Sequence, residues 1–114
     1  MKDMLNLDEF QEFVQTLSQS QYIDIYAHDA NAKIAQYGGH LLSNTGKFVQ
    51  IYQDTELQIN HSLNVSKEHV IIIISKHLKN IYLLDIAKTL SRRHIPFTVI
   101  TGYEKMPYLN IHHQ

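Results

Sequence analysis

A six-residue stretch, Val70 to Ser75, constrains the fold of this chain more than any other segment. It reads VIIIIS, so its five consecutive apolar side chains would alternate between the two faces of a strand. A strand that is apolar on both faces is typical of the centre of a parallel sheet with helices on each side. We therefore expect an α/β protein, and 114 residues suffice for one such core.

Helix and strand patterns alternate along the rest of the chain. The strand segments are short and rich in β-branched and aromatic residues: 22–27, 47–52, 70–75 and 96–101. The helices show apolar residues at helical spacing and begin at about 7, after Asp29 or Asn31, after Asp54 and after Asn80. This order predicts a three-layer α/β/α sandwich with an open parallel sheet of four strands.

We expect one domain over residues 1–114. A leading helix covers 7–18, an α/β core covers 22–102, and 103–114 form either a tail or a fifth, edge strand. The segment between Gly102 and Tyr108 is too short to hold a crossover helix, which rules out a further parallel strand.

Two glycine features of the second helix carry further expectations. Gly38 and Gly39 lie inside it, where glycine is unfavourable by propensity, so we expect close packing against a neighbouring element. Gly46 suits a left-handed residue that ends this helix.

Composition excludes several classes of function. Ten Lys and Arg residues against eleven Asp and Glu give a net charge of −1, so we expect no direct nucleic-acid contact. Arg92 and Arg93 are interpreted as a solvated helix end. The absence of cysteine excludes thiolate catalysis and cysteine-based metal centres. The stretch MKDMLNLDEF lacks the apolar segment of a secretory signal, so we expect none there, and we expect no membrane span because every apolar run is too short. We therefore expect a cytoplasmic protein.

Two loops are expected at a ligand-binding edge of the sheet. If the 22–27 strand lies between the 47–52 and 70–75 strands, the connections diverge at the carboxyl ends of 22–27 and 70–75, and ligands bind at such a point. Both loops lead into helix N-termini, which favour anions. The side chains expected there are His28, Asp29, Asn31, Ser75, His77, Lys79 and Asn80. Ser and Asn are also ordinary helix caps, so a purely structural role stays open.

Residues 69–102 resemble the middle of a sugar isomerase (SIS) domain. They contain an apolar strand ending in Ser75, the loop KHLKN, the helical stretch IAKTL and the strand FTVITG. Residues 22–42 resemble the first strand and helix of that family, so the resemblance spans about 7–102. It is strongest to the effector domain of RpiR-type transcription regulators, which lacks catalytic residues.

The resemblance implies an SIS/flavodoxin-like fold and a non-catalytic, phosphosugar-binding domain. This domain would be the ligand-sensing part of an RpiR-like transcriptional regulator, with a sugar phosphate or another anionic metabolite as its ligand and no cofactor. Ser75, Asn80 and Asn31 would hold the phosphate, with His28 in the same loops. His77 and Lys79 would assist electrostatically and Asp29 would take a sugar hydroxyl. The resemblance also implies a homodimer, for which the 7–18 helix and the Gly38–Gly39 helix are the candidate surfaces.

The two loops depart from the glycine-rich pattern of the family. Where the family has G-x-G-x-S this chain has Ala27 to Asn31, and Leu78 replaces the glycine of S-x-S-G-x-T. Glycine lets a backbone approach an anion closely, so a degenerate, ligand-free dimerisation module is one alternative. A sugar-phosphate isomerase that uses His28 or His77 is another. No Glu falls on the predicted edge, so we predict no catalytic residue.

The remaining histidines give no sign of a metal site. His61, His69 and His94 have no histidine or carboxylate partner three or four positions away, and His112 and His113 are adjacent on the tail. We therefore predict no metal ligand and interpret these histidines as scattered surface residues.

Overall fold

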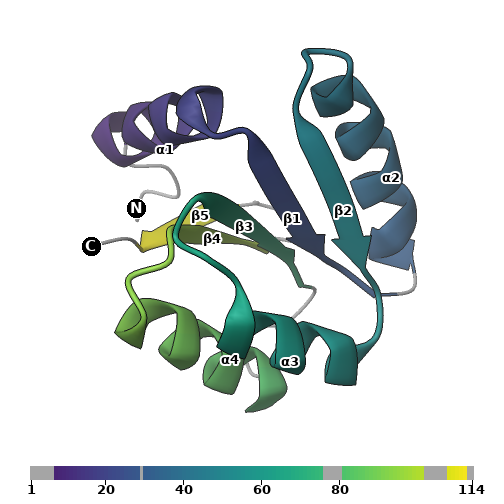
Figure 1. The fold of residues 1–114 in the computed structure, drawn as a ribbon, viewed down its shortest axis with the longest axis vertical. Coiled ribbons are helices and arrows are strands. Elements are labelled where there is room, and N and C mark those ends of the chain that lie inside the picture. The colour runs from purple at the N-terminus through teal and green to yellow at the C-terminus, as the bar shows by residue number, and fades with distance from the viewer. Residues whose placement is uncertain (1–6, 29, 76–80, 102–107, 113–114) are drawn as a thin grey trace.

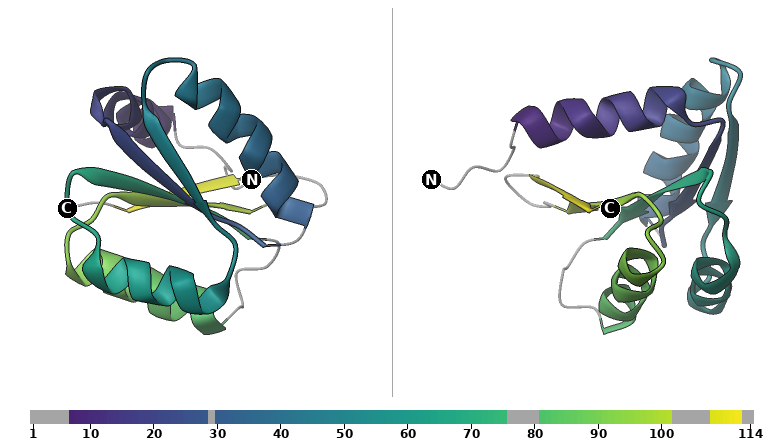
Figure 2. Two further views of the ribbon diagram at one scale, coloured as in Figure 1. Left: turned by 45° about the vertical axis from the view of Figure 1, so that its right-hand side comes forward. Right: turned by 60° about the vertical axis from the view of Figure 1, so that its left-hand side comes forward.

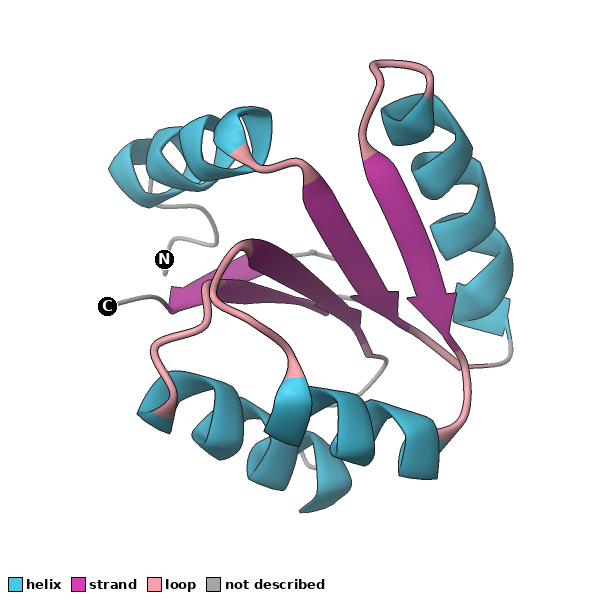
Figure 3. Cartoon of the chain, viewed as in Figure 1, coloured by secondary structure: helices cyan, strands magenta, loops and turns pink. Residues whose placement is uncertain are grey.

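The computed structural model describes residues 7–28, 30–75, 81–101 and 108–112. Helices cover both faces of a single twisted sheet (Figure 1; Figure 3). The elements in chain order are α1 (Leu7–Gln19), β1 (Tyr22–Tyr26), α2 (Ala30–Ser43), β2 (Phe48–Tyr52), α3 (Thr55–Asn64), β3 (His69–Ile74), α4 (Ile81–Arg92), β4 (Phe97–Thr101) and β5 (Tyr108–His112). Each predicted helix and strand is present, with bounds that differ by a residue or two.

The sheet has the strand order β2-β1-β3-β4-β5. The first four strands are parallel, as predicted, and β5 pairs antiparallel with β4. The last segment of the chain is therefore an edge strand, which was one of its two expected forms. Its direction follows from its short connection, since a chain that turns back directly can pair only antiparallel.

The sheet separates two layers of helices. Helices α1 and α2 lie on one face, and α3 and α4 lie side by side on the other (Figure 2). Strand β3 is buried on both faces as its sequence predicts: Val70 and Ile72 belong to the apolar cluster on the α2 side, while Ile71 and Ile73 belong to the cluster on the α3 and α4 side. Double-sided burial explains why this strand needs apolar residues at successive positions.

Local signals set several element ends. Asp54 caps α3, its carboxylate accepting a hydrogen bond from the Leu57 backbone N–H at 3.3 Å. Gly46 has a φ of +89°, the left-handed conformation expected after α2.

The two glycines inside α2 differ in their packing. A Cβ on Gly39 would meet Val49 Cγ1 at 3.2 Å, so close packing is confirmed there. The expectation of close packing is wrong for Gly38, where a Cβ would meet nothing within 4 Å.

The end of α4 also differs from its sequence interpretation. Arg93 is not simply solvated: its guanidinium donates hydrogen bonds to the carbonyls of Ser62 and Val65, at 2.8 and 2.7 Å. These carbonyls end α3, so Arg93 ties the two helices of this layer together. Among the described residues no helix is both long and apolar enough to cross a membrane.

Candidate functional site

The strand order creates a topological switch point between β1 and β3. The two strands are hydrogen-bonded neighbours, with Tyr26 opposite Ile73 near their carboxyl ends. The chain leaves β1 into α2 on one face of the sheet and leaves β3 into α4 on the other (Figure 1). The condition on which the sequence-based site rests, that the first strand lies between the second and third, is therefore met.

The structure locates part of the predicted site. Ser75 directly follows β3, and its backbone N–H donates to the Ile100 carbonyl at 3.0 Å, which extends the pairing with β4. Asn31 lies in the first turn of α2, although the position of its side chain is outside the described part of the chain. The other predicted ligands Asp29, His77, Lys79 and Asn80 also lie outside the described residues.

His28 reaches toward a third loop that the sequence analysis did not include. Its Nε2 lies 3.0 Å from Thr55 Oγ1, a hydrogen-bond distance. Thr55 is the first residue of α3 and follows β2, so its hydroxyl belongs to the same edge of the sheet as the loops after β1 and β3. A signal for this position is present in the sequence, because Asp54-Thr55 after a strand indicates the start of a helix at the same edge of the sheet.

A hollow of about 420 Å³ lies at the opposite, amino end of the sheet. Its lining comes from segments that precede β1, β3 and β4, and it carries one Lys and one Glu: Thr16, Gln19, Ser20, Gln21, Tyr22, Lys67, Glu68 and Pro96. Charges of opposite sign give this hollow no net attraction for a phosphate, so it does not compete with the switch point as an anion site.

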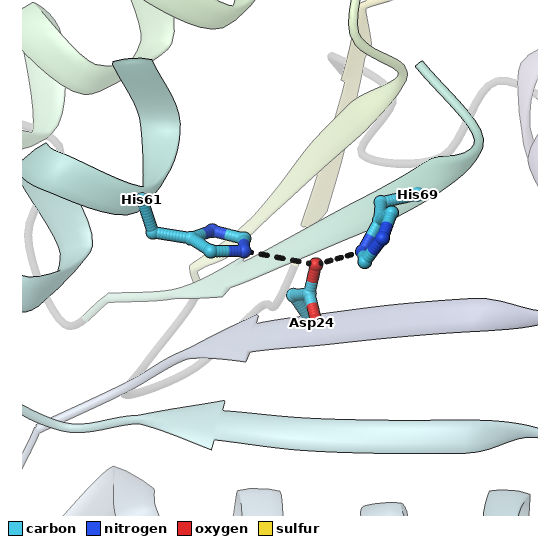
Figure 4. A group of neighbouring side chains, drawn as sticks. All are labelled: Asp24, His61 and His69. Carbon is cyan, nitrogen blue, oxygen red and sulfur yellow. Dashed lines mark hydrogen bonds and ion pairs between the residues drawn. The ribbon is translucent and has the colours of Figure 1, made fainter. Parts of the chain in front are cut away.

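A second cluster of polar side chains lies on the α3 side of the sheet (Figure 4). Asp24 projects from the middle of β1, and its side chain is only 2% exposed. Its Oδ2 lies 2.6 Å from His69 Nδ1, at the start of β3, and 3.3 Å from His61 Nε2, on α3. A buried carboxylate is costly unless paired and hydrogen-bonded, and both imidazoles serve that purpose.

Aromatic rings surround the two imidazoles of this cluster. The Tyr26 hydroxyl lies 2.6 Å from His61 Nδ1, and the rings of His61 and Tyr52 have centroids 4.3 Å apart. On the other side the ring of Tyr22 stacks on His69, with centroids 4.9 Å apart. These contacts fix the orientation of both imidazoles relative to Asp24.

The pKa values of two tyrosines in this cluster are raised. Burial, with the negative charge of Asp24 as the next cause, raises the pKa of Tyr26 far above its ordinary value. The same two causes raise the pKa of Tyr52. The Tyr26 hydroxyl is neutral at physiological pH and can donate its proton to His61 Nδ1 in the tautomer that keeps the other proton on Nε2.

The interpretation of His61 and His69 as scattered surface residues is therefore wrong. Their side chains are 15% and 27% exposed and converge on one buried carboxylate. Spacings of three or four positions do not reveal this cluster, because Asp24 lies on a different element and as many as 45 positions from its partner.

Comparison with known proteins identifies the family. The family model of the SIS domain matches residues 16–108. The chain belongs to the SIS domain family. This confirms the resemblance, which the sequence placed over about residues 7–102. No curated protein is similar enough in sequence to give a significant match.

Two solved structures share the SIS fold of this chain. The Vibrio vulnificus NanR protein complexed with ManNAc-6P superposes with a TM-score of 0.79 at 16% identity, covering 96% of this chain and 44% of that one. The sugar isomerase domain of the RpiR transcription factor from Sphaerobacter thermophilus gives 0.70 at 13% identity, covering 87% of this chain and 56% of that one. The chain thus spans about half the length of each, and the likeness establishes the fold.

Proposed function

We propose that this chain is a non-catalytic, phosphosugar-binding SIS domain, the ligand-sensing part of an RpiR-like transcriptional regulator. The observation that carries this proposal is the β1–β3 switch point in a chain of the SIS family. Two solved proteins of the same fold add support, since one is a transcription factor and the other is complexed with a sugar phosphate. Residues 1–114 would act as one domain in the cytoplasm.

The proposed ligand site comprises the loops after β1 and β3. Ser75, Asn31 and Asn80 would bind the phosphate, and the N-termini of α2 and α4 would favour its negative charge. His77 and Lys79 would add positive charge, and Asp29 would accept a hydrogen bond from a sugar hydroxyl.

His28 would support this site from its edge. Its hydrogen bond to Thr55 fixes the imidazole beside the start of α3. The imidazole in this position can donate to the sugar or hold the loop after β1, and neither role needs a proton transfer to substrate.

Signalling would follow from a shift between two dimer arrangements. A ligand shifts such an equilibrium only by the difference in its affinities for the two states, and a tenfold difference corresponds to about 1.4 kcal/mol. The proposed dimer surface combines α1 and α2, on which Val14, Tyr37 and Leu41 are exposed apolar residues. No contact with nucleic acid by this chain itself is required.

A thermal-shift panel of sugar phosphates tests the proposal. We would include ManNAc-6P, hexose 6-phosphates, the corresponding unphosphorylated sugars and inorganic phosphate. A ligand at about 100 times its Kd stabilises the protein by about 2.7 kcal/mol, which raises the Tm by several degrees. We expect this rise with one sugar phosphate and not with its unphosphorylated form.

A pair of lysine variants locates the binding site. Lys79→Ala should weaken the shift, whereas Lys88→Ala, which removes the same charge from an exposed position of α4, should leave it unchanged. A stable dimer with no response to any sugar phosphate would instead establish a ligand-free dimerisation module. Turnover of an aldose or ketose phosphate that is lost in His77→Ala or His28→Ala would establish an isomerase.

A further inference from the structure

We infer that Asp24, His61 and His69 form a binding site for a divalent metal ion of the zinc class. This site goes beyond the proposed sugar-phosphate function, because it lies on the α3 face and is built from residues outside the switch-point loops. Two imidazole nitrogens and one carboxylate oxygen are a donor set suited to Zn²⁺ or Fe²⁺, with further positions left for water.

The positions of the donor atoms fit a single ion. The three atoms, one from each side chain, all lie within 4.8 Å of one another. Ligand atoms at about 2.0–2.1 Å from Zn²⁺ in a tetrahedron are about 3.3 Å apart. Asp24 Oδ2 and His61 Nε2 are already at 3.3 Å. His69 Nδ1, at 2.6 Å from the same oxygen, needs to withdraw by several tenths of an ångström, a motion within reach of a partly exposed side chain.

An outer hydrogen bond supports one of the ligands. Metal-binding histidines usually use their second ring nitrogen in a hydrogen bond that fixes the ring. The second nitrogen of His61 lies 2.6 Å from the Tyr26 hydroxyl, and the ring of Tyr52 packs against the same imidazole. With a metal on Nε2 the imidazole proton resides on Nδ1, so Nδ1–H would donate to Tyr26 Oη.

The charges around the cluster also suit a cation. Asp24 is a buried carboxylate, and His61 lies in the last turn of α3, where the helix dipole favours positive charge. Arg93 is a cation close to this end of α3, and by itself it would oppose a metal ion. Its guanidinium is paired with the carbonyls of Ser62 and Val65. His69 is 27% exposed, the largest fraction of the three ligands, so an ion would enter from solvent on the side of this residue.

Zinc titration of the full chain tests the site. The protein is stripped with a chelator, and Zn²⁺ binding is measured by calorimetry at pH 7.5, with Co²⁺ added in parallel as a spectroscopic probe. We expect one equivalent of Zn²⁺ and the visible absorption of Co²⁺ bound to nitrogen and oxygen ligands. Tyr26→Phe should weaken binding about 10–100-fold without changing the stoichiometry. Asp24→Asn and His69→Ala should weaken it further.

Two control variants distinguish this cluster from the other histidines. His40→Ala removes an exposed histidine on the opposite face of the sheet and should bind Zn²⁺ as the wild type does. The double variant His112→Ala/His113→Ala should also be unchanged. His69→Ala changes a side chain at the edge of the cluster, so circular dichroism should show a folded protein even if Asp24→Asn unfolds.

Two results would overturn the inference. One is a wild-type protein that takes up no Zn²⁺ and gives no Co²⁺ spectrum, in which case the cluster is only a structural tie between β1, α3 and β3. The other is full binding by folded His69→Ala, which would place the ion elsewhere.

Discussion

Neighbouring residues of β1 project into two differently built halves of the core. On the α2 side Ile23 and Ile25 belong to a hydrophobic cluster, with Gly39 letting the helix approach closely. On the α3 side Asp24 and Tyr26 enter a network of hydrogen bonds that includes two imidazoles. One strand therefore combines a dry face and a polar face within four residues.

The difference shows how the two halves hold their elements in place. The dry face depends on the fit of volumes, which tolerates some repacking but gives no fixed hydrogen-bond geometry. The polar face contains a buried charge, which is tolerable only if every partner is in place. That requirement fixes α3 and the start of β3 relative to β1, and the proposed metal site rests on the same fixed geometry.

The largest expected effect comes from the dry face. Ile25→Ala should lower the free energy of unfolding by about 2–5 kcal/mol, because it removes buried carbon atoms and leaves a cavity against α2. Ile25→Val, the matched control, should cost about 0.5–1.5 kcal/mol. Urea unfolding measures both. Equal losses for the two variants would show that this face is not closely packed.

A smaller effect is expected one residue further along, on the polar face. Tyr26→Phe keeps the ring and removes the hydroxyl that lies 2.6 Å from His61 Nδ1. We expect a loss of about 1–3 kcal/mol at pH 7, since the buried nitrogen is left without its partner. Urea unfolding with a chelator present keeps this effect separate from metal binding, and no loss would contradict the proposed hydrogen bond.

The same variant tests the pH dependence of the polar face. The raised pKa of Tyr26 means that the unfolded chain loses this proton near pH 10 while the folded protein retains it. The contribution of Tyr26 to the free energy of unfolding is therefore fully present below pH 10 and is lost above it, by at most about 1.4 kcal/mol per pH unit for one tyrosine. The free energy of unfolding, measured between pH 8 and 11, should fall less steeply with pH in Tyr26→Phe than in the wild type.

The smallest effects distinguish two adjacent glycines of α2. Gly38→Ala should stabilise the protein by up to about 1 kcal/mol, because alanine favours helix and its methyl group meets nothing within 4 Å. Gly39→Ala should stabilise the protein less than Gly38→Ala or should destabilise it, since its methyl group would lie 3.2 Å from Val49 Cγ1. Thermal unfolding compares the pair, and an equal gain in both would show that the dry face can yield.

Most of the fold was predictable from local sequence. The apolar run after His69 identified the central strand, Asp54 marked the start of α3, and Gly46 marked the turn after α2. These signals work because side-chain periodicity and capping depend on residues close in the chain. The direction of the last strand needed only the length of its connection.

The candidate sites were less predictable. The switch-point loops followed from a topological rule once the strand order was assumed, and the structure supplied that order. The contact between His28 and Thr55 was missed because it joins loops from different strands. The meeting of Asp24 with His61 and His69 was missed because no sequence spacing records it.

The sequence by itself determined that this chain is an α/β protein of alternating helices and strands, and it pointed to the SIS family. Those properties depend on patterns within a few residues of each other. Only the tertiary structure decided that the single carboxylate of β1 would be buried between two histidines from other elements. Strand order and helix packing bring distant residues together, and the cost of a buried charge then selects the partners that surround it.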